Sequence, residues 1–211
     1  MRAMLPEHWF DRLERRLGIL AIPGLASFLV GMNAVVWVMT LMRPEFTFRL
    51  MLFPGAVRAG EWWRLLTFAI VPPRVAPLWM IFWLLLLYKY ASDLEQEWGD
   101  FRFNLFFGTG VFATAAAAMA SGYPMTNVTL NASLFLAFAT LYPDFVINVY
   151  MIIPVKVRWL GALAALGLAW KFLAGGAGAR WEVSSGILNY LLFFGVDHWA
   201  SVKRLWRRRG R

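Results

Sequence analysis

The sequence predicts an all-α integral membrane protein: a bundle of six transmembrane helices with a first loop embedded in the membrane. Of its 211 residues 60% are hydrophobic, and the mean hydropathy is +0.57, which is too apolar for a soluble domain. Long apolar runs recur along the chain between short charged or glycine- and proline-rich segments. The Lys and Arg residues gather at both ends and beside these runs, as the positive-inside rule predicts.

The composition argues against several other classes of protein. A net charge of +9 could indicate nucleic-acid binding, but the cations flank apolar runs as membrane topology requires, so we expect no nucleic-acid partner. The chain has no Cys, which excludes disulfides and thiolate zinc sites. The two histidines, His8 and His198, lie near opposite ends without a partner at ligand spacing. We therefore expect no bound metal and no cofactor.

The chain begins with a predicted surface helix over residues 1–18. Trp9 and Phe10 belong to an apolar helical stripe, and Arg residues lie off that stripe. This pattern is typical of a helix lying in the membrane interface; the alternative is a polar tail. Residues 19–42 form the first predicted span, in which small residues and Asn33 favour close contact with another helix. Residues 43–74 are too apolar to extend into water, so we expect a loop embedded in the outer leaflet.

Five further spans are predicted after this loop. The second helix is expected to run on beyond its span to Glu95, and a charged turn separates it from the third. An apolar segment over 145–154 is expected at the cytoplasmic interface, and glycines at 175–178 break the chain after the fifth span. The predicted spans are residues 75–90, 101–120, 132–142, 159–173 and 183–196.

The distribution of charge sets the predicted topology. An even number of spans places both termini on one side, which carries 14 Lys and Arg residues against 7 on the other. Positive charge accumulates on the cytoplasmic side. We therefore expect residues 19–196 to form the membrane domain, residues 197–211 to form a basic cytoplasmic tail, and both termini to be cytoplasmic. The frequent Arg and Ala and the compact size favour a bacterial inner membrane.

Short motifs frame the second predicted span. In chain order they read Trp-Arg-x-x-Thr, then Leu-Glu, then Gly-x-x-Arg-Phe. This order resembles the rhomboid superfamily, and a Tyr-Lys-Tyr run three residues before the Leu-Glu pair resembles its derlin branch. The motif residues are Trp63, Arg64, Leu94, Glu95, Gly99 and Arg102.

The resemblance implies a role for each motif. The Trp-Arg pair would organise the first loop, and the Leu-Glu-x-x-x-Gly segment would close the second helix against the third. We expect Arg64 to donate hydrogen bonds to carbonyls of the first loop, because its guanidinium carries several fixed donors. Glu95 is expected to cap or brace the turn before the third span, with Arg102 as a candidate partner. The alternative is that the Trp-rich stretch is only an aromatic belt at the membrane interface.

The resemblance also indicates which catalytic residues are missing. An active rhomboid is a Ser–His protease, and Ser133 stands where its serine is expected, near the start of the fourth span. Leu134 follows in place of a small residue, which would crowd the amides of an oxyanion hole. The span 183–196 contains no His, and Trp79 and Trp83 occupy the positions of the second-span oxyanion ligands. A serine needs a nearby base, so we predict a pseudoprotease in which Ser133 is vestigial, either a helix N-cap or a small packing residue.

Further expectations concern the last two spans. Tyr190 stands four residues after Gly186, where a small residue would pack more closely, and is expected to loosen the sixth span against the fourth. Asn189 is polar within an apolar span, so it should face the bundle or a wet cavity. Lys171 is the cationic candidate for an unusual base, but we expect it to snorkel to the surface.

These features lead to a functional hypothesis: a catalytically inactive, derlin-like protein that binds transmembrane clients and passes them to a partner such as a membrane-anchored AAA protease or ATPase. Short fourth and sixth spans would thin the bilayer locally, which lowers the cost of polar residues in a client helix. We expect the client groove between the second and fifth spans, open at the outer half of the bilayer. Its predicted lining is Trp79, Phe82, Trp83, Trp170 and Phe172.

Three alternatives to this hypothesis remain at the level of sequence. The aromatic side chains could simply face lipid or pack the core. The protein could be an active intramembrane serine protease that uses Ser133 with an unusual base. It could also be a small six-span transporter or channel. Such a protein would need inverted-repeat symmetry or intramembrane ionisable residues, and we find neither apart from Lys171, since Lys89 and Arg102 lie at the ends of their predicted spans.

Overall fold

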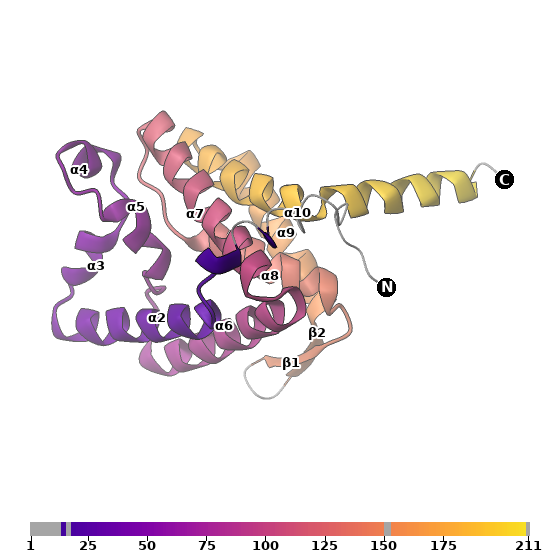
Figure 1. The fold of residues 1–211 in the computed structure, drawn as a ribbon, viewed down its shortest axis with the longest axis horizontal. Coiled ribbons are helices and arrows are strands. Elements are labelled where there is room, and N and C mark those ends of the chain that lie inside the picture. Colours follow the sequence, from indigo (N-terminus) through magenta and orange to yellow (C-terminus); the bar gives the residue numbers. More distant parts are fainter. Residues whose placement is uncertain (1–13, 16–17, 150–152, 210–211) are drawn as a thin grey trace.

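The computed structural model describes residues 14–15, 18–149 and 153–209, which are mostly helical (Figure 1). The α-helices are α2 (Leu25–Met42), α3 (Phe46–Leu50), α4 (Pro54–Arg58), α5 (Arg64–Thr67), α6 (Pro77–Trp98), α7 (Asp100–Ser121), α8 (Val128–Leu141), α9 (Val157–Ala174) and α10 (Ala177–Arg209). The 3₁₀ turns are η1 (Gly18–Leu20) and η2 (Phe68–Ile70), and the strands are β1 (Val146–Val149) and β2 (Ile153–Lys156).

Three helices among the described residues are long and apolar enough to cross a membrane: α2, α7 and α9. Helix α8 is also apolar but has only 14 residues, whereas α6 and α10 are longer and carry charged residues. The chain is therefore a helical protein compatible with a membrane environment, as the sequence predicts. The full set of six spans stays a prediction.

Helix α7 lies at the centre of the bundle and packs against α6, α8 and α10. Its turn from α6 is a single residue, Gly99, whose φ of 79° is a conformation that favours glycine. Large aromatic side chains fill the space around α7, including the fully buried Phe103, Phe106 and Phe138. At Gly110 a side chain would collide, since an added Cβ would lie 2.5 Å from Leu130 Cδ1. The glycine thus allows α7 to approach its neighbours closely.

The first loop, which the sequence predicts as a membrane-embedded segment, folds into α3, α4, α5 and η2. In Figure 1 these short helices lie at one end of the bundle, beside the end of α2. Asn127, in the loop before α8, donates from Nδ2 to the carbonyls of Ala69 (3.0 Å) and Val71 (2.8 Å). The end of the first loop is therefore attached to the α7–α8 connection by two hydrogen bonds.

The prediction of an all-α protein is wrong at one point, the segment over 145–154. Strands β1 and β2 form an antiparallel hairpin there, with Val146 opposite Lys156 (Figure 1). The segment is rich in β-branched residues, which suit a strand better than a helix. Asp144 precedes the hairpin and pairs with Lys156 (3.1 Å) and Arg158 (3.6 Å). These two cations hold the pKa of Asp144 below its usual value, so the pairing persists at neutral pH and weakens as pH falls through that lowered pKa.

Several predicted boundaries also differ from the helices. Helix α2 begins at Leu25 and not at residue 19, because Gly24 at its N-cap has a φ of 69° and follows a proline. Helix α10 has 33 residues, so the predicted sixth span of residues 183–196 lies inside a longer helix that continues through the described part of the predicted tail. The predicted surface helix over 1–18 lies largely outside the described residues.

Candidate functional site

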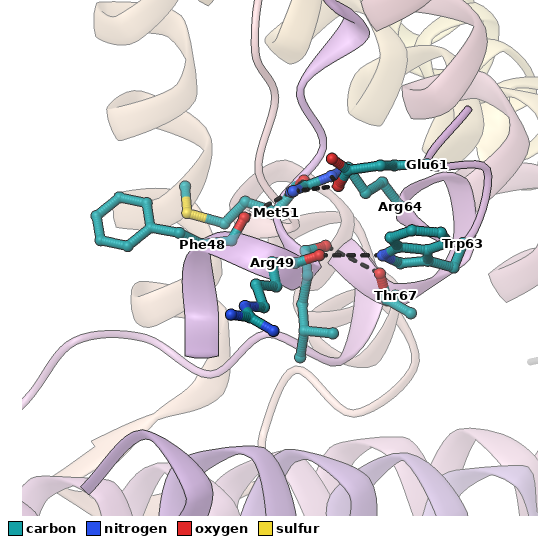
Figure 2. Close-up of polar contacts among 8 residues, drawn as sticks. Phe48, Arg49, Met51, Glu61, Trp63, Arg64 and Thr67 are labelled. Atoms are coloured by element: carbon teal, nitrogen blue, oxygen red, sulfur yellow. Dashed lines mark hydrogen bonds and ion pairs between the residues drawn. The ribbon is translucent and has the colours of Figure 1, made fainter. Parts of the chain in front are cut away.

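The first loop contains a set of hydrogen bonds centred on Arg64, which is only 7% exposed. Its Nη1 donates to the carbonyls of Phe48 (2.5 Å) and Met51 (2.8 Å), and its Nε donates to Glu61 Oε2 at 2.6 Å (Figure 2). The hydrogen bonds that we expected from Arg64 to first-loop carbonyls are therefore present. Glu61 compensates the buried positive charge, which would otherwise be costly.

The neighbours of Arg64 complete the same pattern. Trp63 Nε1 donates to the carbonyl of Arg49 (3.2 Å), and Thr67 Oγ1 donates to that of Leu50 (3.0 Å) (Figure 2). Residues 48–51 thus present four consecutive carbonyls, at the C-terminal end of α3, to donors carried by α5 and its N-cap. A helix leaves its last carbonyls without intrahelical partners, and a cation there also interacts favourably with the helix dipole. The side chains of the Trp-Arg-x-x-Thr motif therefore cap the C-terminal end of α3.

Glu95 contacts an element that the sequence did not predict. Its Oε1 accepts a hydrogen bond from the backbone N–H of Ala26 at 3.3 Å, so its carboxylate lies at the N-terminus of α2. The N-cap of α2 is Gly24, which has no side chain to cap the helix, and a carboxylate at a helix N-terminus is stabilising. The neighbouring Leu94 is fully buried, and Arg102 Nε lies 3.9 Å from Glu14 Oε2.

Ser133 is 1% exposed and lies within α8, well after its N-cap Asn127. Its Oγ donates to the carbonyl of Leu130, three residues earlier, at 2.8 Å. The N-cap interpretation is therefore wrong, and the interpretation as a small packing residue agrees with the burial. The Ser133 hydroxyl is thus directed to a backbone carbonyl, and the next residue, Leu134, is fully buried.

The polar residues of α10 meet α7 and α8 in the bundle. Asn189 is fully buried, accepts a hydrogen bond from Thr109 Oγ1 (2.8 Å) and donates to the carbonyl of Phe106 (3.2 Å), so it faces the bundle as expected. A Cβ added at Gly186 would lie 2.9 Å from both the backbone oxygen and the Cβ of Thr129 on α8. Helix α10 therefore approaches α8 closely.

The expected loosening by Tyr190 is not found. Its hydroxyl lies 2.7 Å from Thr140 Oγ1 on α8, and its ring stacks on Phe194 at a centroid distance of 5.0 Å. The tyrosine is accommodated because it extends along the α8–α10 contact and ends at a polar partner. The bulk of Tyr190 at this contact is thus compensated by ring packing and one hydrogen bond.

Lys171 forms an ion pair and does not extend freely to the surface as predicted. It pairs with Glu182, Nζ to Oε2 at 2.6 Å, across the glycine-rich break between α9 and α10. Glu182 is 8% exposed, and its other oxygen accepts from Thr126 Oγ1 at 2.5 Å. One buried carboxylate therefore joins α9, α10 and the α7–α8 loop. Sequence reasoning missed Glu182, although an acidic residue beside an apolar span and 11 residues after a lone lysine is a usable signal.

A groove of about 710 Å³ lies between α6, α9 and the β1 strand. Three of the predicted groove residues, Trp79, Phe82 and Trp83, are part of its wall on α6. The wall on α9 is formed by residues of its first half, next to the hairpin. These residues are Leu160, Leu163 and Ala164.

The other two predicted groove residues lie elsewhere. Trp170 (73% exposed) and Phe172 (39% exposed) belong to the second half of α9 and are not among the residues that line this groove. A groove thus lies between the second and fifth helices, α6 and α9, as predicted. Its lining lies at the hairpin end of α9, whereas the prediction placed the opening at the outer half of the bilayer, away from the segment over 145–154. Aromatic character alone does not determine which half of α9 lines the groove, and the lining half carries Leu160, Leu163 and Ala164.

Comparison with protein-family models finds no match to this chain, and comparison with curated proteins finds no significant match either.

The hydrogen bonds of Arg64 predict a large and specific loss of stability on truncation. Arg64→Ala leaves the carbonyls of Phe48 and Met51 and the carboxylate of Glu61 without their donor, and losing one partner of a buried charged set costs about 3 kcal/mol or more. The apparent Tm in detergent should fall clearly more for Arg64→Ala than for Arg43→Ala, an exposed arginine near the start of the same loop. Equal small shifts would mean that the stretch is only an interface anchor.

Proposed function

We propose that this protein is a non-catalytic, rhomboid-like and derlin-like membrane protein that binds transmembrane helices of client proteins and assists their quality control or trafficking. Helices α2, α6, α7, α8, α9 and α10 would be its six spans, with both termini in the cytoplasm of a bacterial cell. The observation that carries the proposal is the apolar groove between α6, α9 and β1. The motif resemblance adds support, because it links the capped first loop to this class of protein.

The groove has the surface properties that a helix-binding site needs. Its walls contain exposed apolar side chains on both helices, such as Leu85 (61% exposed) and Leu163 (66% exposed). Aromatic residues on α6 supply large contact areas with few rotatable bonds, which suits a surface that binds helices of varied sequence. Lys89 lines the groove at one end, where its Nζ pairs with Asp93 at 2.8 Å and lies 5.0 Å from the centroid of the Phe145 ring. A client helix in the groove would therefore meet an apolar wall with a charged end.

The proposal includes local thinning of the bilayer, and only the short helix α8 now supports it. Helix α8 has 14 residues, which corresponds to roughly 21 Å at the helical rise. A hydrocarbon core is about 30 Å thick, so lipid around α8 would have to compress. The long helix α10 does not contribute to this argument, because its 33 residues exceed the length needed to cross.

The proposal also includes a partner that acts on the bound client. In Figure 1 the C-terminal part of α10 extends well beyond the bundle as a continuous helix. A projecting helix is accessible to another protein, and we assign it to contact with a membrane-anchored AAA protease or ATPase. The hydroxyl of Ser133 donates to a carbonyl of its own helix, which supports a division of labour in which this chain binds and the partner cleaves or extracts.

Site-specific photo-crosslinking tests the groove. Photoreactive residues placed at Phe82 on α6 and Leu163 on α9 should capture a co-expressed single-span client, because both side chains line the groove. A probe at Val35, which is exposed on α2 at 51% and lies outside the groove, should capture little. Capture of equal strength at all three positions would show that the contact is collisional, and the groove proposal would then fail.

Ser133 provides a separate test of the non-catalytic assignment. Ser133→Ala removes a hydroxyl that donates only to a carbonyl of its own helix, so client turnover in cells and thermal stability should change little, with a stability change of about 1 kcal/mol or less. The matched control is Thr140→Ala, which removes the hydroxyl that meets Tyr190. If purified wild-type protein cleaves a model transmembrane substrate and Ser133→Ala abolishes the cleavage, the protein is a protease.

A further inference from the structure

A second apolar groove, of about 780 Å³, lies between α2, the α5–η2 segment of the first loop and α7. Its walls are formed by aliphatic, aromatic and glycine residues, and Asn104 is the polar exception among the lining residues. The amide of Asn104 is already engaged, because it accepts from the N–H of Ile22 and donates to the carbonyl of Ile22, both at 3.0 Å. Among the described lining residues, this end of the groove therefore offers no unengaged polar side chain to a ligand.

The opposite end of the groove carries a cation and a tryptophan. Arg58 is exposed, and its Nη2 donates to the carbonyl of Met119, which lines the groove, at 3.0 Å. Within the described part of the chain Nε and Nη1 of Arg58 make no further hydrogen bond. Trp62 also lines the groove and is 66% exposed. Tryptophan is typical of the headgroup level of a membrane, and an exposed arginine can reach that level with its charged end.

The groove is longer than one leaflet of a bilayer is thick. Its α7 wall runs from Asn104 to Met119, which corresponds to roughly 22 Å at the helical rise. Half of a hydrocarbon core is about 15 Å, so the groove has room for an acyl chain across the full depth of one leaflet. Helices α2 and α7 are two of the three described helices that are long and apolar enough to cross a membrane. The inference rests on the proposed function, in which both helices are spans and the groove between them is surrounded by acyl chains.

We propose that this groove binds one phospholipid with an anionic headgroup. Its acyl chain lies along α7 between α2 and the α5–η2 segment, and its phosphate accepts hydrogen bonds from the free donors of Arg58. An arginine binds phosphate through paired, charge-assisted hydrogen bonds, and this interaction is stronger than a neutral one. The same groove could also receive a second copy of the chain, which the experiment below distinguishes.

Gly108 makes the groove easy to fill without disturbing the fold. It lines the groove, and a Cβ added there has no heavy atom of another segment within 4 Å. Gly108→Leu therefore places a side chain in the space assigned to the acyl chain, and replacing glycine inside a helix favours the helix. Gly31 and Gly167 lie on α2 and α9, are exposed and are equally free of contacts at Cβ, so Gly31→Leu and Gly167→Leu are matched controls.

The test is native mass spectrometry of the full-length protein in a mild detergent, titrated with dioleoylphosphatidylglycerol or with dioleoylphosphatidylcholine. The wild type and both control variants should retain one phosphatidylglycerol. Gly108→Leu should weaken the binding of either lipid by about tenfold or more, and Arg58→Gln should reduce the preference for phosphatidylglycerol. Retention by Gly108→Leu equal to that of the wild type would overturn the proposal. Loss of a protein dimer without a change in lipid retention would overturn it as well, and would assign the groove to a second copy.

Discussion

Helix α3 ends inside the first loop with carbonyl groups that its own backbone cannot satisfy, and α5 with its N-cap Trp63 supplies the donors. Arg64 and Thr67 complete this set, so the carbonyls of residues 48–51 all have partners. In a hydrocarbon environment an unsatisfied carbonyl costs several kcal/mol, and irregular backbone at membrane depth requires partners within the protein. The loop over 43–74 can therefore be compact and apolar at its surface only because these contacts are made.

Other parts of the fold depend on the position of this loop. The α5–η2 segment forms one wall of the groove against α2 and α7, and the end of the segment is held by the two hydrogen bonds from Asn127. Similar contacts join other helix ends, since Glu95 meets the N-terminus of α2 and Glu182 joins α9 to α10. Polar side chains thus fix the ends of the helices, while aromatic and small residues pack between them. Two buried polar atoms, Asn33 Oδ1 and Thr129 Oγ1, have no partner within the described residues.

The sequence predicted the long helices well, because apolar runs of sufficient length and glycine or proline breaks are local signals. It also predicted the donor role of Arg64, since a buried arginine in an apolar loop has few other partners than carbonyls. It did not predict the hairpin, because a short apolar run of β-branched residues can be read as an interfacial segment or as a strand. The partners of Glu95 and Lys171 were missed for another reason. These partners, Ala26 and Glu182, are identified only by how the helices pack in three dimensions.

The most direct test measures client binding by protein in which the groove between α6, α9 and β1 has been filled. A fluorescently labelled single-span peptide with a polar residue at its centre would be titrated, in nanodiscs, against wild-type protein, Ala164→Trp and Ala165→Trp. Ala164 lines the groove between α6, α9 and β1, whereas the adjacent Ala165 is exposed on α9 and does not line that groove. The account predicts that Ala164→Trp weakens binding by about tenfold or more and that Ala165→Trp binds as the wild type does. Equal binding by all three proteins would contradict it.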